Sequence, residues 1–154
     1  MHHIEVLLHN IRSAHNVGSV FRTADAAGVA RVHLSGYTPR PVDRFGRVSK
    51  EIAKTALGAE ASVLWRYRAN PQAVIADARA RGLCVVGIEQ DARAVDYRTY
   101  TAAGPLLLLV GNEVRGLSPA LRDACDMLVE IPQYGSKESL NVSVAAGVVL
   151  FRLV

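Results

Sequence analysis

The stretch LLLLVGNEVRGLS, residues 106–118, decides the fold class. It begins with an aliphatic run, and such runs are typical of strands buried on both faces of a parallel sheet. Leu83–Ile88 is a second run of this kind. Shorter strand-like segments alternate with helical segments through the rest of the chain. This alternation predicts an α/β fold, a mostly parallel sheet with helices on both faces.

The predicted elements follow one another without a repeat or a low-complexity tract. The predicted strands are Ile4–Leu8, Ala30–Leu34, Ser62–Tyr67, Leu83–Ile88, Pro105–Val110 and Met127–Ile131. The predicted helices are Asn16–Ala27, Val48–Ala56, Pro71–Arg81, Ser118–Ala124 and a last one from about Ser139 to the end. Gly28 and Gly82 are expected to end helices, and Ser118-Pro119 to begin one. With its 154 residues the chain is expected to form one domain, residues 1–154.

The composition restricts the class of protein. Half of the residues are hydrophobic and 6% are aromatic, which suits an aliphatic-rich α/β domain and argues against disorder. The formal net charge of +4 favours, without requiring, a phosphate-bearing partner. The longest apolar run, Leu106–Val110, is too short to cross a bilayer, and no signal peptide is recognisable. We therefore expect a cytoplasmic protein with no membrane partner.

The cysteines and histidines give no sign of a metal site. Cys84 and Cys125 do not form a C-x-x-C pair and are expected to be buried free thiols. The spacing that is typical of a metal site is not found among the five histidines: His2, His3, His9, His15 and His33.

The first of three polar loops follows the first strand, and ligands of open α/β sheets bind beyond the carboxyl ends of strands. This loop and its helix read NIRSAHNVGSVFRTADAAGV, residues 10–29, with Asn16 as a natural N-cap. Gly18 in the first helical turn costs about 1 kcal/mol of helix stability, so something is expected to approach that backbone closely. A phosphate site and a capped surface helix with Arg22 paired to Asp25 are both open.

The second loop follows the central aliphatic strand. The spacing of Gly111 and Gly116-Leu117-Ser118 imitates a phosphate-binding P-loop, but Leu117 replaces the lysine that would reach the phosphates. This disfavours a nucleotide triphosphatase. Glu113 lies directly after a buried strand, where a carboxylate is costly unless it is paired or exposed. We expect it to have a partner, with Arg22 as the candidate; an ordinary turn is the alternative.

The third loop leads into the last helix within IPQYGSKESLNVSVAAGVVLF, residues 131–151. Ser139 or Ser136 can cap this helix, which is apolar nearly all round and is therefore expected to be covered partly by a second subunit. Asn141 would sit in its first turn, either in a structural cap network or at a site. Together, the three loops predict that Asn16, Arg22, Glu113 and Asn141 converge on one crevice.

Three ordered motifs in these loops resemble one family. NVGSVFRTADAAGV resembles N-x-G-x-x-x-R-T-A, LLLVGNEVRGLS resembles a strand entering G-N-E-x-x-G-L, and IPQYGSKESLNVSVAAG resembles I-P…S-L-N-V-S-x-A. These are the motifs of the SpoU, or TrmH-like, branch of the SPOUT superfamily of RNA methyltransferases. The resemblance spans nearly the whole chain.

The resemblance implies a C-terminal deep trefoil knot, an obligate homodimer, S-adenosylmethionine held in the knot loops, and methylation of a ribose 2′-hydroxyl. General topology rules argue against knots, so that expectation comes from the resemblance alone. The implied catalytic residues are Arg22, Asn16, Glu113, Ser139 and Asn141. The implied cofactor-binding residues are Gly87, Ile88, Gly111, Ile131, Gln133 and Leu140.

Relatives often carry an RNA-binding extension, and this chain shows no such separate segment. RNA recognition is therefore expected from the basic loop around Arg40, Arg44, Arg47 and Lys50, from the other subunit, or from a separate partner. The candidate RNA-binding residues are Arg40, Arg44, Arg47, Lys50 and Lys137. A merely solvated basic loop is the alternative. The sequence thus predicts an S-adenosylmethionine-dependent RNA ribose 2′-O-methyltransferase, with tRNA favoured over rRNA as substrate. A knotted RNA-binding protein without activity, and a need for an accessory protein, stay open.

Overall fold

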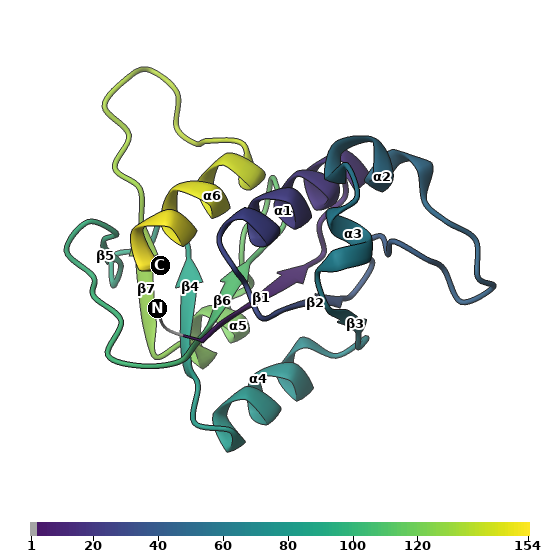
Figure 1. Ribbon diagram of the computed structural model, residues 1–154. Helices are drawn as coiled ribbons and strands as arrows, with labels where there is room; N and C mark the ends of the chain where they lie inside the picture. Colours follow the sequence, from purple (N-terminus) through teal and green to yellow (C-terminus); the bar gives the residue numbers. More distant parts are fainter. Residues whose placement is uncertain (1–2) are drawn as a thin grey trace.

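Seven parallel strands form one sheet at the centre of the molecule (Figure 1). The computed structural model describes residues 3–154. The strands are β1 Ile4–His9, β2 Arg31–Ser35, β3 Trp65–Tyr67, β4 Cys84–Ile88, β5 Val95–Asp96, β6 Leu106–Val110 and β7 Met127–Glu130. Their order in the sheet is β3-β2-β1-β6-β4-β7-β5. The two aliphatic runs are therefore central neighbours, β6 and β4, as their composition predicted.

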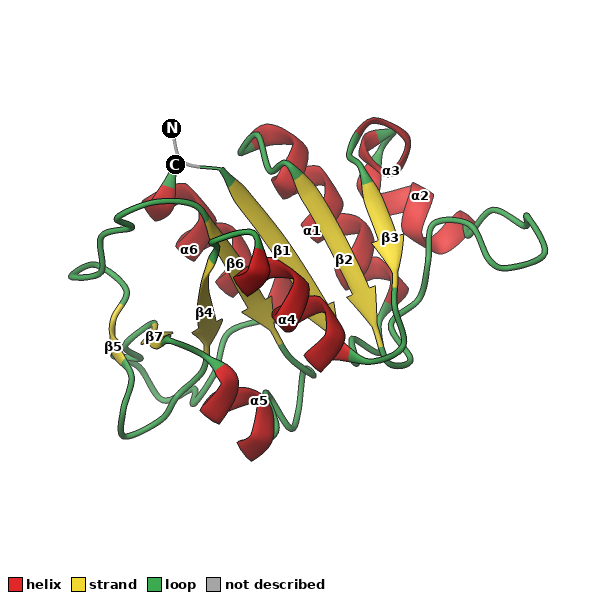
Figure 2. Cartoon of the chain, turned by 90° about the horizontal axis from the view of Figure 1, so that it is seen from below, coloured by secondary structure: helices red, strands yellow, loops and turns green. Residues whose placement is uncertain are grey.

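Helices cover both faces of this sheet (Figures 1 and 2). On one face lie α1 Ala14–Ala26, α2 Lys50–Ala56, α3 Ala59–Ser62 and α6 Val142–Leu153. On the other lie α4 Pro71–Ala80 and α5 Pro119–Ala124. Successive side chains of a strand point to opposite faces. Val6 and Leu8 accordingly join the core under α1 and α6, whereas Leu7 packs with Val74 of α4. The predicted α/β architecture is confirmed.

The later strands enter the sheet out of chain order. After β4 the chain forms the edge strand β5, returns to the centre as β6, and places β7 between β4 and β5. The 131–141 segment then leads into α6, which packs against α1 and β4. This order brings the carboxyl ends of β4, β6 and β7 side by side. The trefoil knot that the resemblance implies stays a prediction.

Two helices begin at different residues from those predicted. Ser13 caps α1 and its hydroxyl accepts a hydrogen bond from the backbone N–H of Asn16, so the prediction that Asn16 is the cap was wrong. Asn141, rather than Ser139 or Ser136, caps α6 and accepts from the N–H of Ser143. In both helices, the predicted and the observed cap residues are types that are equally suited to this position.

Other bounds differ by a few residues. β3 begins at Trp65 rather than Ser62 because Ala59–Ser62 form the short helix α3. The two-residue strand β5 was not predicted. α2 begins at Lys50, after the cap Ser49. Gly28 and Gly82 have the positive φ angles, 69° and 82°, of residues that end helices, and Ser118 caps α5 as predicted.

Gly18 lies in the contact between α1 and α2. A Cβ built at this position would collide with the hydroxyl of Thr55 and the backbone carbonyl of Ile52. The close approach expected from the sequence is therefore that of a second helix. Gly18 itself therefore gives no support to a phosphate site.

We expect Gly18→Ala to destabilise the fold by about 1–3 kcal/mol, because the extra methyl overpacks the α1–α2 contact. Urea unfolding measures this change. Gly104→Ala is the matched control, since a Cβ there meets nothing within 4 Å. A Gly18→Ala protein as stable as wild type would show that the two helices separate without cost.

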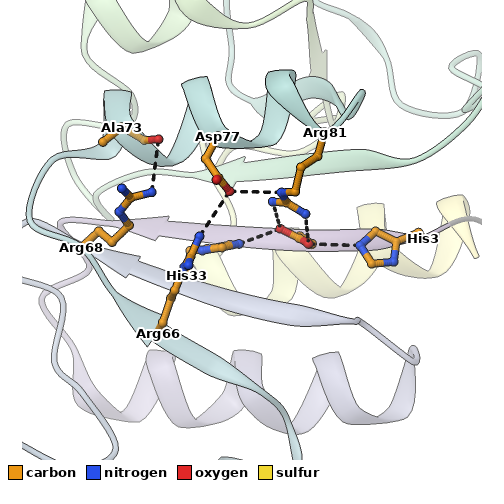
Figure 3. Close-up of polar contacts among 8 residues, drawn as sticks. His3, His33, Arg66, Arg68, Ala73, Asp77 and Arg81 are labelled. Atoms are coloured by element: carbon orange, nitrogen blue, oxygen red, sulfur yellow. Dashed lines mark hydrogen bonds and ion pairs between the residues drawn. The ribbon is translucent and has the colours of Figure 1, made fainter.

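A buried ion network fastens α4 to the sheet (Figure 3). The carboxylate of Glu5 is 2% exposed and accepts from both terminal nitrogens of Arg81, at 2.7 and 2.8 Å. His33 Nε2, fully buried, lies 2.7 Å from the same carboxylate. Asp77 of α4 accepts from Arg66 of β3 and from Arg81, so one network joins α4 to three strands.

Within residues 3–154, no helix is long and apolar enough to cross a membrane. The same residues contain no group of three or more His, Cys, Asp or Glu side chains that could hold a metal ion, and His2 lies outside them. Cys84 and Cys125 are free thiols, as predicted, but both residues are partly exposed rather than fully buried.

Candidate functional site

Three loops meet at the carboxyl edge of the sheet and are joined by hydrogen bonds between side chains. Asn16 Nδ2 donates to Glu113 Oε1 over 3.1 Å, and Asn141 Nδ2 donates to Asn16 Oδ1, also over 3.1 Å. These residues follow β1, β6 and β7, respectively. The predicted convergence is confirmed for these three residues, which we call the Glu113–Asn16–Asn141 chain.

The carboxylate of Glu113 is held by the start of α1. Its oxygens accept from the backbone N–H groups of Arg12, at 2.9 and 3.1 Å, and of Ser13, at 3.0 Å. Partial burial raises the pKa of Glu113, but these backbone donors and the amide of Asn16 outweigh it and lower the pKa overall. Glu113 therefore stays ionised at neutral pH and is a weak base.

Arg22 is not part of this chain, and the predicted Arg22–Glu113 pair was wrong. Arg22 lies six residues after Asn16, about 9 Å further along α1, on an exposed face. Within residues 3–154 its side chain makes no ion pair or hydrogen bond. The backbone donors next to Glu113 already satisfy the carboxylate, so no cation is needed there.

A cavity of about 320 Å³ opens beside the Glu113–Asn16–Asn141 chain, between the ends of β4, β6 and β7. We call it the β4–β6–β7 cavity. Its apolar wall is formed by Ile88, Val110, Ile131, Leu140 and Val142. The predicted residues Gly111, Gln133, Ser139 and Glu113 also line it. The lining therefore offers both apolar contacts and polar partners to a ligand.

Close backbone contacts shape the floor of the cavity. A Cβ at Gly111 would lie 2.6 Å from the backbone of Gly116, so only glycine allows this turn to close. Glu89 Oε2 accepts from the N–H of Leu117 over 2.7 Å, which ties the end of β4 to the loop after β6. Gln90 Nε2 donates to the carbonyl of Glu138 over 2.6 Å and so ties the end of β4 to the 131–141 segment.

Glu89 and Gln90 both line the cavity and were missed from the sequence. The rule that ligands bind beyond strand ends could have found them, because they directly follow β4. Gly87, by contrast, does not line the cavity. A Cβ at Gly87 would lie 2.8 Å from Cys125 Sγ, so packing against the end of α5 already requires a glycine there.

The predicted RNA-binding residues lie elsewhere. The basic loop extends past α2 at one side of the molecule (Figure 2), and none of its residues lines the cavity. Arg40 stacks on Tyr67 at 4.1 Å, while Arg44 and Arg47 lie over the ring of Phe45. Arg47 also pairs with Asp43 at 2.8 Å. Lys50 begins α2, and Lys137 lies in the 131–141 segment beside Glu138.

Known proteins resemble this chain over nearly its whole length. The sequence model of the SpoU rRNA Methylase family matches residues 3–151. The 23S rRNA (guanosine-2′-O-)-methyltransferase RlmB of Ralstonia nicotianae is 38% identical over 149 residues, which are 97% of this chain and 57% of that protein. The chain thus spans a little over half the length of this relative.

Solved structures agree with the sequence comparison. An AdoMet-bound rRNA methyltransferase from Sinorhizobium meliloti superposes with a TM-score of 0.88 at 36% identity, covering 97% of this chain and 55% of that one. A TrmH/SpoU tRNA modifying enzyme from A. aeolicus gives 0.85 at 28% identity, covering 99% and 74%. On its three motifs, its fold and these matches, the chain belongs to the SpoU rRNA Methylase family, the TrmH-like branch of the SPOUT superfamily.

Proposed function

We propose that this chain is an S-adenosylmethionine-dependent RNA ribose 2′-O-methyltransferase. The observation that carries the proposal is the β4–β6–β7 cavity, which adjoins the Glu113–Asn16–Asn141 chain: Glu113 belongs to both. A ligand site and a set of fixed polar groups thus share one wall. The names of the relatives, which include rRNA and tRNA methyltransferases, support the same activity.

The residues of the cavity fit S-adenosylmethionine. Its volume of about 320 Å³ lies at the lower end of the range for small-molecule sites. Ile88, Ile131 and Leu140 would hold the adenine ring, and the carboxylates of Glu89 and Glu130 suit hydroxyl and ammonium groups. When bound, this cofactor would supply a methyl group made electrophilic by its sulfonium.

The Glu113–Asn16–Asn141 chain would position the ribose. Asn141 is fixed at both ends of its amide, because Nδ2 donates to Asn16 and Oδ1 accepts from Ser143. Such fixed groups act by alignment, which contributes much of the rate when two reactants must meet in line. The oxygens of Glu113 already accept from Arg12, Ser13 and Asn16, so the proton that the 2′-hydroxyl loses as its oxygen bonds to the methyl group would pass to a phosphate oxygen of the RNA or to water.

Arg22 does not line the cavity and would bind the RNA phosphate next to the target. Its guanidinium is exposed and carries no partner within residues 3–154, and the planar fork of a guanidinium suits a phosphate group. We expect Arg22→Ala to lower single-turnover methyl transfer about 10²-fold and to weaken RNA binding. Arg22→Lys should be intermediate, since it keeps the charge but loses the planar fork.

Tritiated-methyl transfer to RNA and an RNA titration measure these two effects. Arg31→Ala, a charge change at the amino end of β2, is the control. If both Arg22 variants equal wild type in RNA binding and in turnover, Arg22 has no part in the reaction.

The substrate is RNA, with tRNA and rRNA to be tested on equal terms. The sequence favoured tRNA, but relatives are named for both. Mass-spectrometric mapping of ribose methylation with and without the gene product identifies the target. Cofactor binding in calorimetry without transfer to either RNA would instead favour an RNA-binding protein without activity, or one that needs an accessory protein.

A homodimer is also proposed. The outer face of α6 exposes Val144 by 49% and Phe151 by 55%, although the helix is apolar. A second copy would remove these side chains from water. Analytical ultracentrifugation tests this, and a monomer at micromolar concentration would contradict it.

A further inference from the structure

We propose that a second hollow, next to the β4–β6–β7 cavity, binds an RNA nucleotide that flanks the methylated one. Tyr37 would stack on its base, and Arg12 and Arg115 would hold the phosphates on either side. This inference rests on the proposed function. Arg115 lies within the second motif, whereas Arg12 and Tyr37 lie outside all three motifs.

The hollow lies between the loops that follow β1, β2 and β6. It has a volume of about 490 Å³ and is lined by Arg12, Tyr37, Asn112, Val114 and Arg115. We call it the arginine–tyrosine hollow. Asn112, Val114 and Arg115 line the β4–β6–β7 cavity as well, so the two spaces share a wall. A strand of RNA with its reacting ribose at the cavity would place a neighbouring nucleotide here.

Tyr37 is held rigidly while its ring stays in water. Its backbone N–H donates to Asn10 Oδ1 over 3.1 Å, and its hydroxyl accepts from Asn112 Nδ2 over 3.0 Å. Asn112 Nδ2 also donates to the carbonyl of Asn10 over 2.9 Å. Asn10 itself has a φ of 55°, a left-handed conformation that costs energy outside glycine. Tyr37 is nevertheless 58% exposed.

A fixed, exposed aromatic ring is suited to stacking. Single-stranded RNA offers unstacked bases to aromatic side chains, and this contact tolerates any base because every base has a π-face. Tyr37 loses little side-chain freedom on binding, since its hydroxyl and its backbone are already fixed.

The two arginines that flank Tyr37 differ from most others in the chain. Carboxylates neutralise Arg47, Arg66, Arg79, Arg81, Arg93, Arg98 and Arg122. Arg12 and Arg115 are exposed, and within residues 3–154 neither guanidinium has an ion pair or a hydrogen bond. Unpaired guanidiniums bind phosphate in a bidentate manner. Two of them around one aromatic ring match the order phosphate, base, phosphate of an RNA strand.

The test is a titration of in-vitro-transcribed tRNA and 23S rRNA followed by fluorescence anisotropy at several salt concentrations. Tyr37→Ala should bind on the order of tenfold more weakly than wild type, and Tyr37→Phe, which keeps the ring, should recover most of this loss. Arg12→Gln and Arg115→Gln should each reduce the slope of log Kd against log salt by about 0.7–0.9. Arg31→Gln, with the same charge change at the opposite edge of the sheet, should leave the slope unchanged.

Three outcomes would overturn the subsite. If wild type methylates RNA but the Tyr37, Arg12 and Arg115 variants bind it with unchanged affinity and salt slope, the subsite is wrong and the proposed function stands. If Arg31→Gln changes the slope as much as the others, the effect is one of net charge only. If wild type binds S-adenosylmethionine in calorimetry yet neither binds nor methylates RNA, the proposed function fails and the subsite with it. The same calorimetry checks that Tyr37→Ala is folded, because Tyr37 does not line the cofactor cavity.

Discussion

We expect Glu113→Gln, which replaces one carboxylate oxygen by an NH2 group, to lower methyl transfer at least 10²-fold. This is the largest loss of activity that we expect from any substitution in the site. The carboxylate accepts from three separate donors, Arg12 N, Ser13 N and Asn16 Nδ2. An amide offers one oxygen in place of two and turns an N–H group toward a donor. With its oxygen in the place of Oε1, the amide would turn its NH2 group toward the N–H of Arg12. The side chain would move away from this donor, and Asn16 and Asn141 would shift with it. Misplacing aligned groups by about 1 Å is enough for a loss of this size.

The same variant should be less stable by about 1–3 kcal/mol, because hydrogen bonds to a charged acceptor are lost at the start of α1. Hydrogen exchange gives the sharper readout, since the amides of Arg12 and Ser13 should lose protection while the core of β6 keeps it. Glu51→Gln, an exposed glutamate in the first turn of α2, is the matched control. Glu113→Gln with wild-type turnover and protected amides would exclude Glu113 as the organiser of the site.

The sequence was most informative where burial leaves few alternatives. β4 and β6 are covered by helices on both faces, so nearly all their residues had to be apolar, and this composition alone identified them as central parallel strands. The turn at Ser118-Pro119 was equally clear, because a hydroxyl cap followed by proline suits only the start of a helix. From these elements the edge of the sheet that carries the site followed directly.

The partners of polar side chains were harder to predict. Ser13 and Asn16 are both good caps, and the local sequence does not choose between them. Once Ser13 takes that place, Asn16 is free to bridge Glu113 and Asn141. Similarly, no pattern in the sequence says that backbone N–H groups, instead of Arg22, satisfy Glu113. Such choices depend on loops that are about 100 residues apart in the chain.

The glycines likewise show that a sequence does not identify the partner in a contact. Gly18, Gly87 and Gly111 all looked suitable for close approach of a ligand, and a Cβ at each would indeed collide with a neighbour. The neighbour is a helix at Gly18, the thiol of Cys125 at Gly87, and the loop of the site itself at Gly111. A glycine in a sequence predicts a close contact but does not identify what makes it.

Removing the buried carboxylate in Glu5→Leu is expected to cost about 3 kcal/mol, the largest loss of stability among the substitutions considered. Breaking a buried pair by deleting one partner leaves the other uncompensated, at roughly 3–5 kcal/mol. We expect the lower end, because the side chain of Arg81 is 36% exposed and can take up water. His33, fully buried, has no such relief. Urea unfolding measures the loss.

The double variant Glu5→Leu/Arg81→Met distinguishes an unpaired charge from a general packing defect. If the destabilisation comes from the unpaired guanidinium of Arg81 and not from poor packing of the new leucine, removing that charge should restore part of the stability. A double variant that is less stable than Glu5→Leu by the full cost of a second defect would contradict this explanation. So would a Glu5→Leu protein within 1 kcal/mol of wild type.

Acid should weaken the same network in two steps, which gives an independent check of its protonation states. Burial lowers the pKa of His33, although Glu5 opposes this. Below about pH 6.5, His33 therefore binds more protons in the unfolded chain than in the folded protein. Burial raises the pKa of Glu5, but hydrogen bonds from Arg81, His33 and His3 outweigh it and hold the pKa far below the usual range. Below about pH 4.3 the unfolded state therefore gains a second proton.

In both steps the free energy of unfolding falls as the pH falls. Urea unfolding at pH 8, 5.5 and 4 should show both losses in wild type. The loss between pH 5.5 and 4 should be smaller in Glu5→Leu but still present, because other carboxyl groups, such as Glu113, also have a lowered pKa in the folded protein. Equal losses below pH 4.3 in the two proteins would mean that Glu5 is not held ionised by its partners.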